Sequence, residues 1–177
     1  EPLPVLVDPE AQRYQPVVLD GVIGDEVLRV LVSQKVVGAG YRLISAFDTG
    51  GRRVLLDRGF VPVAEGEAGY PGGPAQVTGN LHWPDDRNSS TPDNDPADNT
   101  WFARDLAPMA DRLDTEPLLV VTRTMSPADD GVSPLPVDIS GIPNDHLQYA
   151  LTWYSLAAVW LIMTGVWIRR LKTGREA

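Results

Sequence analysis

The chain has 177 residues, with 15 lysines and arginines against 24 aspartates and glutamates, no cysteine and a formal net charge of −9. This length suits a single globular domain. The lack of cysteine excludes disulfides, thiolate metal sites and thiol-based copper delivery. The acidic composition argues against nucleic acid as a partner, because phosphates are bound mainly through Lys and Arg.

Residues 16–125 contain short runs of β-branched and aromatic residues separated by turn residues, a pattern typical of strands. Gly24-Asp25 predicts a turn between the first two runs. Asp48-Thr49-Gly50-Gly51 predicts a tight hairpin, since glycine adopts the positive φ that such turns need. The expected strands are Pro16–Ile23, Val27–Val36, Tyr41–Phe47, Arg53–Val61, Ala75–Trp83 and Pro117–Met125.

The segment Pro84–Asn99 is rich in Asp, Asn and Pro and has no aliphatic residue larger than Ala. This composition predicts a solvated, mobile, acidic loop. Asp93 and Asp95 begin like an EF-hand loop, but Asp98 stands where that loop needs glycine and Arg104 where it needs a bidentate glutamate. A plain loop is therefore favoured over a calcium site.

A short helix is predicted after Asp105, which is a good N-cap residue. Leu106, Met109, Ala110 and Leu113 have the spacing of one apolar helix face. Short strands with one helix indicate a mainly β (α+β) domain. We expect an antiparallel curled sheet or partial β-barrel of about six strands with one short helix.

Tyr149–Ile168 carries no charge, and twenty helical residues extend about 30 Å, the thickness of a bilayer core. This segment predicts a C-terminal transmembrane helix. The basic residues Arg169, Arg170, Lys172 and Arg175 follow it, whereas residues 1–168 hold 11 basic and 23 acidic side chains. The positive-inside rule places the basic tail in the cytoplasm and the acidic domain across the membrane.

The predicted organisation is thus a periplasmic or intermembrane-space domain at 1–143, a transmembrane helix at 144–171 and a basic cytoplasmic tail at 172–177. The expected location is a bacterial inner membrane in preference to a mitochondrial one. Because residue 1 is Glu and no targeting signal follows, we expect the chain to be a processed or excerpted form that lacks an N-terminal signal or membrane helix.

Few residues offer chemistry. The chain has two histidines and no hydrolase elbow, phosphate-binding loop or zinc-protease motif, so we expect a non-enzyme. His82 lies in a predicted strand beside Trp83 and is interpreted as a structural or surface residue.

His146 lies in the predicted first turn of the membrane helix, after the capping residues Asn144-Asp145. Steps of seven residues from His146 and from Tyr149 predict one stripe along the helix, consisting of His146, Tyr149, Trp153, Leu156, Trp160, Met163 and Trp167. Two interpretations stay open. In the first, which spacing favours, the stripe packs against another helix, Trp153, Tyr154 and Trp167 are interfacial anchors and His146 is a polar cap. In the second, the stripe contacts a porphyrin and His146 is an axial ligand of haem iron.

The segment from Asn144 to Tyr154, which reads NDHLQYALTWY, resembles the C-terminal signature of the Surfeit locus family of cytochrome c oxidase assembly factors. Three further blocks agree in order, namely Gly40-Tyr41-Arg42, Val54–Pro62 and the segment from Asn99 through Trp101 to Asp105. Phe60 stands where that family usually has Trp. The resemblance covers roughly residues 15–172.

This resemblance implies a membrane protein with two helices flanking one domain, which assists maturation of oxidase subunit I by binding haem a. It places the proposed haem ligand on His146, with Tyr149 and Trp153 in the same motif. Subunit I, and possibly haem a synthase, are the implied partners. The alternatives are a haem-independent scaffold for a subunit I intermediate and an accessory subunit of a respiratory complex. The roles of Arg58, Gly59 and Trp101 stay open, with a part in the fold favoured over partner contact.

Overall fold

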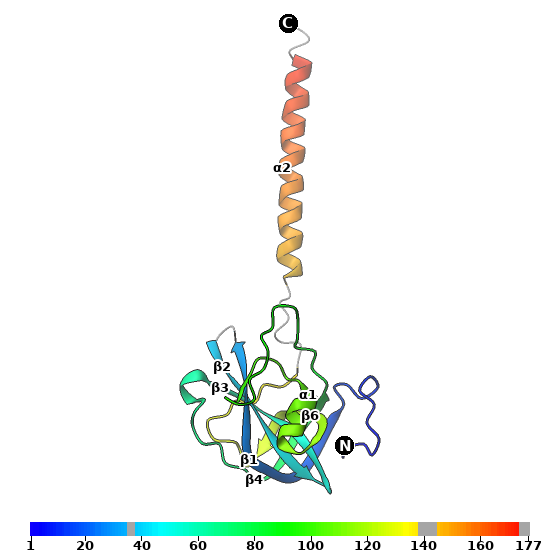
Figure 1. The fold of residues 1–177 in the computed structure, drawn as a ribbon. Coiled ribbons are helices and arrows are strands. Elements are labelled where there is room, and N and C mark those ends of the chain that lie inside the picture. Colours follow the sequence, from blue (N-terminus) through cyan, green and yellow to red (C-terminus); the bar gives the residue numbers. More distant parts are fainter. Residues whose placement is uncertain (35–37, 138–144, 174–177) are drawn as a thin grey trace. The chain divides into compact units, whose positions relative to one another are not determined.

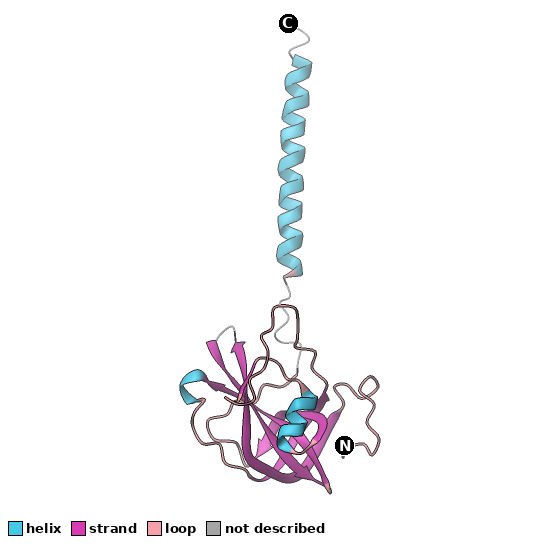
Figure 2. Cartoon of the chain, in the orientation of Figure 1, coloured by secondary structure: helices cyan, strands magenta, loops and turns pink. Residues whose placement is uncertain are grey.

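The computed structural model describes residues 1–34, 38–137 and 145–173, and the chain divides into two compact units, Glu1–Val137 and Asp138–Ala177. Strands dominate the first unit, and the described part of the second is the helix α2 (His146–Thr173) (Figure 2). The predicted boundary at residues 143 and 144 lies outside the described residues, as does most of the predicted tail.

The described part of the first unit contains six strands and two short helical segments (Figure 1). They are β1 (Pro16–Gln34), β2 (Gly38–Thr49), β3 (Arg52–Pro62), the 3-10 helix η1 (Val63–Glu65), β4 (Gly73–His82), β5 (Thr100–Trp101), α1 (Leu106–Leu113) and β6 (Glu116–Ser126).

Five of these strands close into a ring, because β1 pairs with both β2 and β4, and β3 and β6 complete the circuit. The prediction of a mainly β domain with a curled sheet or barrel and one short α-helix is confirmed. The sheet is mixed rather than wholly antiparallel, since β3 pairs with β6 and β1 with β5 in parallel. β6 follows α1 and enters the ring alongside β3 instead of forming a hairpin with it.

The turn predicted at Gly24-Asp25 is wrong, because both flanking runs belong to the single strand β1. Its first part, Pro16–Ile23, pairs with β4, and the part from Val22 onward pairs with β2. The register shifts between Ile23 and Val27, so the glycine marks an irregularity within one strand that changes partners.

The predicted hairpin is confirmed. Gly50 and Gly51 have φ of 57° and 79° between β2 and β3, which are values that glycine tolerates without strain. Thr49 faces Arg52 across this turn in the pairing of the two strands. The glycine pair was sufficient to predict this hairpin from the sequence, because the turn joins two strands that follow one another in the chain.

Residues of the barrel strands build two large apolar clusters, and Leu43 and Val61 form a small third one with Val132. The interior core includes Phe47, Leu56 and Val120 and draws on all five barrel strands. The outer core includes Leu55, Val121 and Trp101, and α1 covers it through Met109, Ala110 and Leu113. The predicted apolar face of α1 is therefore confirmed.

The acidic loop at 84–99 is held to the segment before α1. The Asn94 carboxamide oxygen accepts the backbone N–H groups of Phe102 and Ala103 at 2.8 and 3.1 Å. Asp105 occupies the N-cap position of α1 as predicted, but its carboxylate makes no capping bond. It accepts instead from Asn94 at 2.7 Å and from Arg87 at 2.6 Å. The loop is thus attached to the domain by side chains that the composition alone did not single out.

Candidate functional site

The stripe predicted on the membrane helix lies along α2, which begins at His146. The Asp145 carbonyl accepts the Tyr149 N–H at 2.9 Å, so His146 occupies the first turn. Tyr149 and Trp153 follow three and seven residues later and share a helix face with it. Their exposed fractions are 66% and 69%, and that of Trp160 is 66%. The structure thus places the three predicted site residues on one exposed face.

α2 has the length and composition of a membrane-spanning helix over His146–Arg170, with none of its most apolar window buried in the protein. Thr152 and Ser155 donate to the carbonyls of Gln148 and Leu151 at 2.9 and 2.7 Å. Since these hydroxyls are bonded within the helix, they need no partner in hydrocarbon. These features support a membrane-anchored protein.

In the barrel domain, Arg58 lies at an irregularity in β3, and its side chain is 1% exposed. Its guanidinium donates twice to the Asp129 carboxylate, at 2.7 and 2.8 Å, and also to the carbonyls of Tyr70 and Pro71 at 2.8 and 3.2 Å. This Arg58 clamp joins β3 to two loops that are distant in sequence. The interpretation of Arg58 as a fold determinant is supported.

The neighbouring Gly59 has a φ of 135°, and a Cβ there would lie 2.3 Å from the Ser133 carbonyl oxygen. Phe60 and Ser133 exchange backbone hydrogen bonds of 2.7 and 2.9 Å beside it. The glycine therefore permits residues 129–135, which we call the strap, to lie directly against β3. In the chain, the strap lies between the end of β6 and the start of α2.

Asp57, which directly precedes Arg58 in β3, is buried. Its carboxylate is paired with Arg42 and lies 3.7 Å from Arg104. Burial raises the pKa of Asp57, and the two guanidinium groups oppose this shift. Arg104 also donates to Asp86 at 2.6 and 2.9 Å, and Arg42 donates to the strap at the Leu135 carbonyl, 3.3 Å away. A network of alternating charges thus connects β3, the acidic loop and the strap.

His82 stacks on Tyr14, with ring centroids 5.3 Å apart, at the end of β4. Burial and the nearby Arg104 lower its pKa to about 4, so its imidazole is neutral at neutral pH. Its buried Nδ1 has no hydrogen-bond partner among the described residues. This environment agrees with the predicted structural interpretation of His82.

Trp101 is 1% exposed in the outer core, and its indole N–H donates to Asn99 at 3.2 Å. It therefore serves packing, as favoured from the sequence. The charge network around Asp57 was not predicted. The sequence signal for it was a charged pair, Asp57-Arg58, inside the otherwise apolar run Val54–Val61, where charged residues are rarely buried without partners.

Each unit thus has its own candidate feature. The β-barrel domain has a strap fixed to β3 by buried charges, and α2, which could span a membrane, bears an exposed histidine and an aromatic stripe. The model of the SURF1 family matches residues 1–158, a range that includes His146, Tyr149 and Trp153. The chain belongs to the SURF1 family.

Relatives agree with this assignment. The chain is 34% identical over 141 residues to a SURF1-like protein of Monosiga brevicollis, covering 75% of this chain and 53% of the relative. It is 31% identical over 130 residues to Surfeit locus protein 1 of Xenopus tropicalis, covering 68% and 39%. For human Surfeit locus protein 1 the identity is 29% over 129 residues, covering 70% and 42%. The chain therefore spans about half the length, or less, of these eukaryotic relatives.

Proposed function

We propose that this protein is a cytochrome c oxidase assembly factor that binds haem a and assists its insertion into oxidase subunit I, without catalysing a reaction. The general role comes from membership of the SURF1 family, whose members are oxidase assembly factors. The observation that carries the haem assignment is the exposed His146 at the start of an aromatic stripe on α2.

The residues present suit one side of a porphyrin site. An imidazole is a common axial ligand of haem iron, and Tyr149 and Trp153 supply aromatic surface on the same face. When bound, haem a would supply the redox-active iron that the mature oxidase uses. This chain's part is to hold the macrocycle through His146 and to shield it with the two rings until transfer. Haem a synthase is the proposed donor of the cofactor, and subunit I its recipient.

The test is the absorption spectrum of the protein purified in detergent after co-expression with haem a synthesis. His146→Ala should lose most of the haem absorbance of the parent. Gln148→Ala is the matched control, since it lies in the same turn but off the stripe. A haem content and spectrum unchanged by His146→Ala would refute the ligand role.

A haem-independent scaffold is the second candidate, and Trp160 favours it. This indole is 66% exposed near the middle of α2, away from the interfacial layers where tryptophan usually serves as an anchor. A partner helix of subunit I would cover it. In that case co-purification of subunit I should survive both His146→Ala and haem depletion, but should fall with Trp160→Ala.

The proposed location is an energy-transducing inner membrane, with the barrel on the periplasmic or intermembrane-space side and the basic tail opposite. A permanent accessory subunit would be stoichiometric in the purified active oxidase, whereas an assembly factor should be absent or substoichiometric there. Quantifying the protein in that preparation separates these two roles.

A further inference from the structure

Arg13 and Arg123 differ from the other arginines of the barrel domain. Every other arginine in residues 1–34 and 38–137 is paired with an aspartate or glutamate. Arg13 and Arg123 are exposed, and neither forms an ion pair with a described residue. Residues 1–168 hold 11 basic and 23 acidic side chains. Two unpaired cations on so acidic a domain favour a surface that attracts an external anion.

Both arginines belong to segments that meet at Asn80, which is 7% exposed. Arg123 is the extra residue where the register of β6 against β4 shifts, and its guanidinium donates to the Asn80 carboxamide oxygen at 3.3 Å. The Asn80 amide nitrogen donates in turn to the Tyr14 carbonyl at 2.8 Å. Tyr14 has a φ of 69°, a costly conformation for a residue other than glycine. A bulge and a strained tyrosine thus hold Arg123 and Arg13-Tyr14 on either side of Asn80.

The Tyr14 ring is 48% exposed and stacks on His82, with ring centroids 5.3 Å apart. Besides burial, Arg13 is one of the cations that lower the pKa of His82, so its guanidinium lies near this pair of rings. Asp8 and Glu10, which precede Arg13 in the chain, form no ion pair with it. An exposed aromatic ring therefore lies beside one unpaired cation and two hydrogen bonds away from the other.

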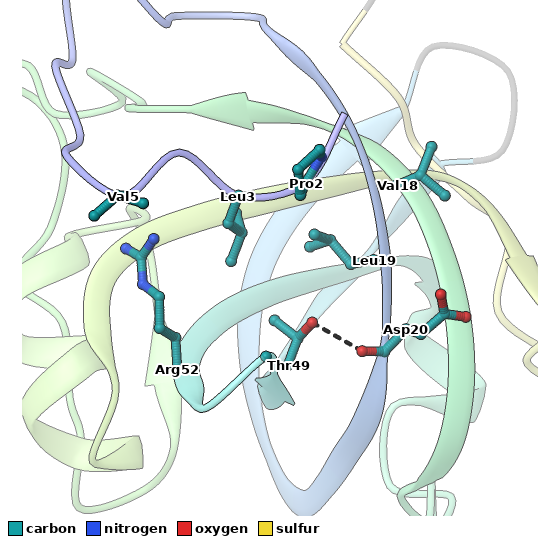
Figure 3. A pocket seen from close by; sticks show the side chains of 9 residues that line it. Pro2, Leu3, Val5, Val18, Leu19, Asp20, Thr49 and Arg52 are labelled. Carbon is teal, nitrogen blue, oxygen red and sulfur yellow. Dashed lines mark hydrogen bonds between the residues drawn. The ribbon is translucent and has the colours of Figure 1, made fainter.

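The first part of β1 continues this surface with an apolar side chain. Leu19 points toward Leu3 and the interior core, whereas Val18 points away from both (Figure 3) and is 47% exposed. Val18 faces Thr78 in β4, which faces Thr124 in β6, and the two threonine hydroxyls bond each other at 2.6 Å. The row from Val18 to Thr124 is thus uncharged, and its hydroxyls are already satisfied.

We call the exposed side chains of this surface the basic patch, which consists of Arg13, Tyr14, Val18, Thr124 and Arg123. None of its members is acidic. Asp20, the next residue on this side of β1, accepts from the Gln76 amide at 3.0 Å and lies at the limit of the patch. The patch therefore combines two cations with apolar and aromatic surface.

The chemistry of the basic patch fits the surface of a phospholipid membrane. Arginine binds phosphate oxygens, and tyrosine is enriched where headgroups meet hydrocarbon. Because the patch is exposed and its two cations are separate, it suits the many phosphates of a bilayer. α2 has the length and composition of a membrane-spanning helix, which keeps the barrel domain near such a surface. The acidic remainder of the domain would be repelled by anionic headgroups, so the patch is the part that they attract.

We propose that the basic patch binds the phosphate groups of anionic phospholipids at the surface of the membrane that α2 enters. Arg13 and Arg123 donate to phosphate oxygens, while the Tyr14 ring and Val18 contact the headgroup layer. This interaction selects which side of the barrel faces the lipid. It goes beyond the proposed function and depends on neither haem nor oxidase, so its failure would leave that function untouched.

The test uses the full chain in nanodiscs of phosphatidylcholine, with or without phosphatidylglycerol. Because the chain has no cysteine, Thr124→Cys and Ala107→Cys each provide a single site for a fluorophore. Thr124 belongs to the patch, whereas Ala107 is exposed on α1 and lies outside it. A nitroxide on the lipid headgroup quenches a fluorophore that comes close to the bilayer surface. Phosphatidylglycerol should increase quenching at position 124 but not at position 107.

Neutralising the arginines examines the charges themselves. One arginine near an anionic membrane changes the ratio of docked to undocked protein about fivefold, so Arg13→Gln and Arg123→Gln should each weaken the phosphatidylglycerol-dependent quenching and together remove most of it. Arg53→Gln is the matched control, because Arg53 is also exposed but is paired with Asp48. Thermal unfolding confirms that each variant is folded. Quenching that ignores phosphatidylglycerol, or that Arg53→Gln lowers as much as Arg123→Gln does, would overturn the proposal.

Discussion

Asp129→Ala should be among the most destabilising single substitutions in the barrel domain. Arg58 is 1% exposed, and Asp129 is the carboxylate that neutralises it through two hydrogen bonds. Removing one partner of a buried ion pair leaves an uncompensated charge, which typically costs about 3–5 kcal/mol. Two carbonyls still accept from Arg58 in the variant, so the expected loss lies at the lower end, about 3 kcal/mol.

The reciprocal change should cost less. In Arg58→Met the orphaned group is Asp129, which is 15% exposed and nearer to water, while the methionine keeps part of the buried volume. We expect a loss of about 2 kcal/mol, and the double variant should resemble Arg58→Met instead of showing the sum of the two losses.

The assay is urea unfolding of the detergent-solubilised chain, followed by the β-sheet ellipticity so that α2 contributes little to the change. Arg53→Gln provides the control, because Arg53 and Asp48 form a surface pair at 3.3 Å with side chains 44% and 49% exposed. Its loss should be below about 1 kcal/mol. Additive losses in the double variant, or an Asp129→Ala protein as stable as the parent, would refute the reasoning.

Three further outcomes are expected. Gly59→Ala should lower the free energy of unfolding by more than about 2 kcal/mol, because the added Cβ collides with the strap. Gly51→Ala, where φ is also positive but the surrounding space is open, should cost about 1 kcal/mol. The urea midpoints of the two variants measure this difference. The pKa of His82 is lowered to about 4 by burial, so the unfolded state binds the proton first, and stability should fall as pH decreases from about 6.5 to 4. His82→Gln should remove about 1 kcal/mol of this fall after allowance for solvent at the partly exposed ring, and an unchanged pH profile would contradict it. Because the chain has no cysteine, Ser89→Cys in the loop and Glu176→Cys in the tail can each be labelled selectively, and an impermeant maleimide applied from the periplasmic side should reach only the former.

The elements predicted correctly from the sequence are those with local signals. The β2–β3 hairpin has its glycine turn, α1 its apolar spacing, and α2 its uncharged run. The turn at Gly24-Asp25 was wrongly predicted because these residues mark a local irregularity in β1. No neighbouring residue indicates that the strand continues beyond it and pairs with a different strand. The two-residue β5 is too short to produce a pattern, and the parallel pairing of β3 with β6 depends on residues far apart in the chain.

Among the candidate functional residues, too, those with a local sequence signal could be predicted and those that depend on distant contacts could not. His146, Tyr149 and Trp153 share a face because helix periodicity alone places them there. The charged partners of Asp57 and Arg58 come from the strap, the segment before α1 and β2, and only the folded barrel brings them together. Sequence reasoning could anticipate that a charged pair in an apolar strand needs counter-charges, but could not name them.

The parallel pairing of β3 with β6 also constrains the order of events during synthesis. β6 is the last strand to be made, and until it arrives β3 and β4 both present open edges that other chains could join. Ring closure is a long-range contact and therefore slow compared with hairpin formation. His146 follows soon after Ser126, so the helix that anchors the chain is made just after the strand that seals the barrel. The ring therefore stays open until shortly before α2 is made, and during that interval the edges of β3 and β4 are exposed to misassembly.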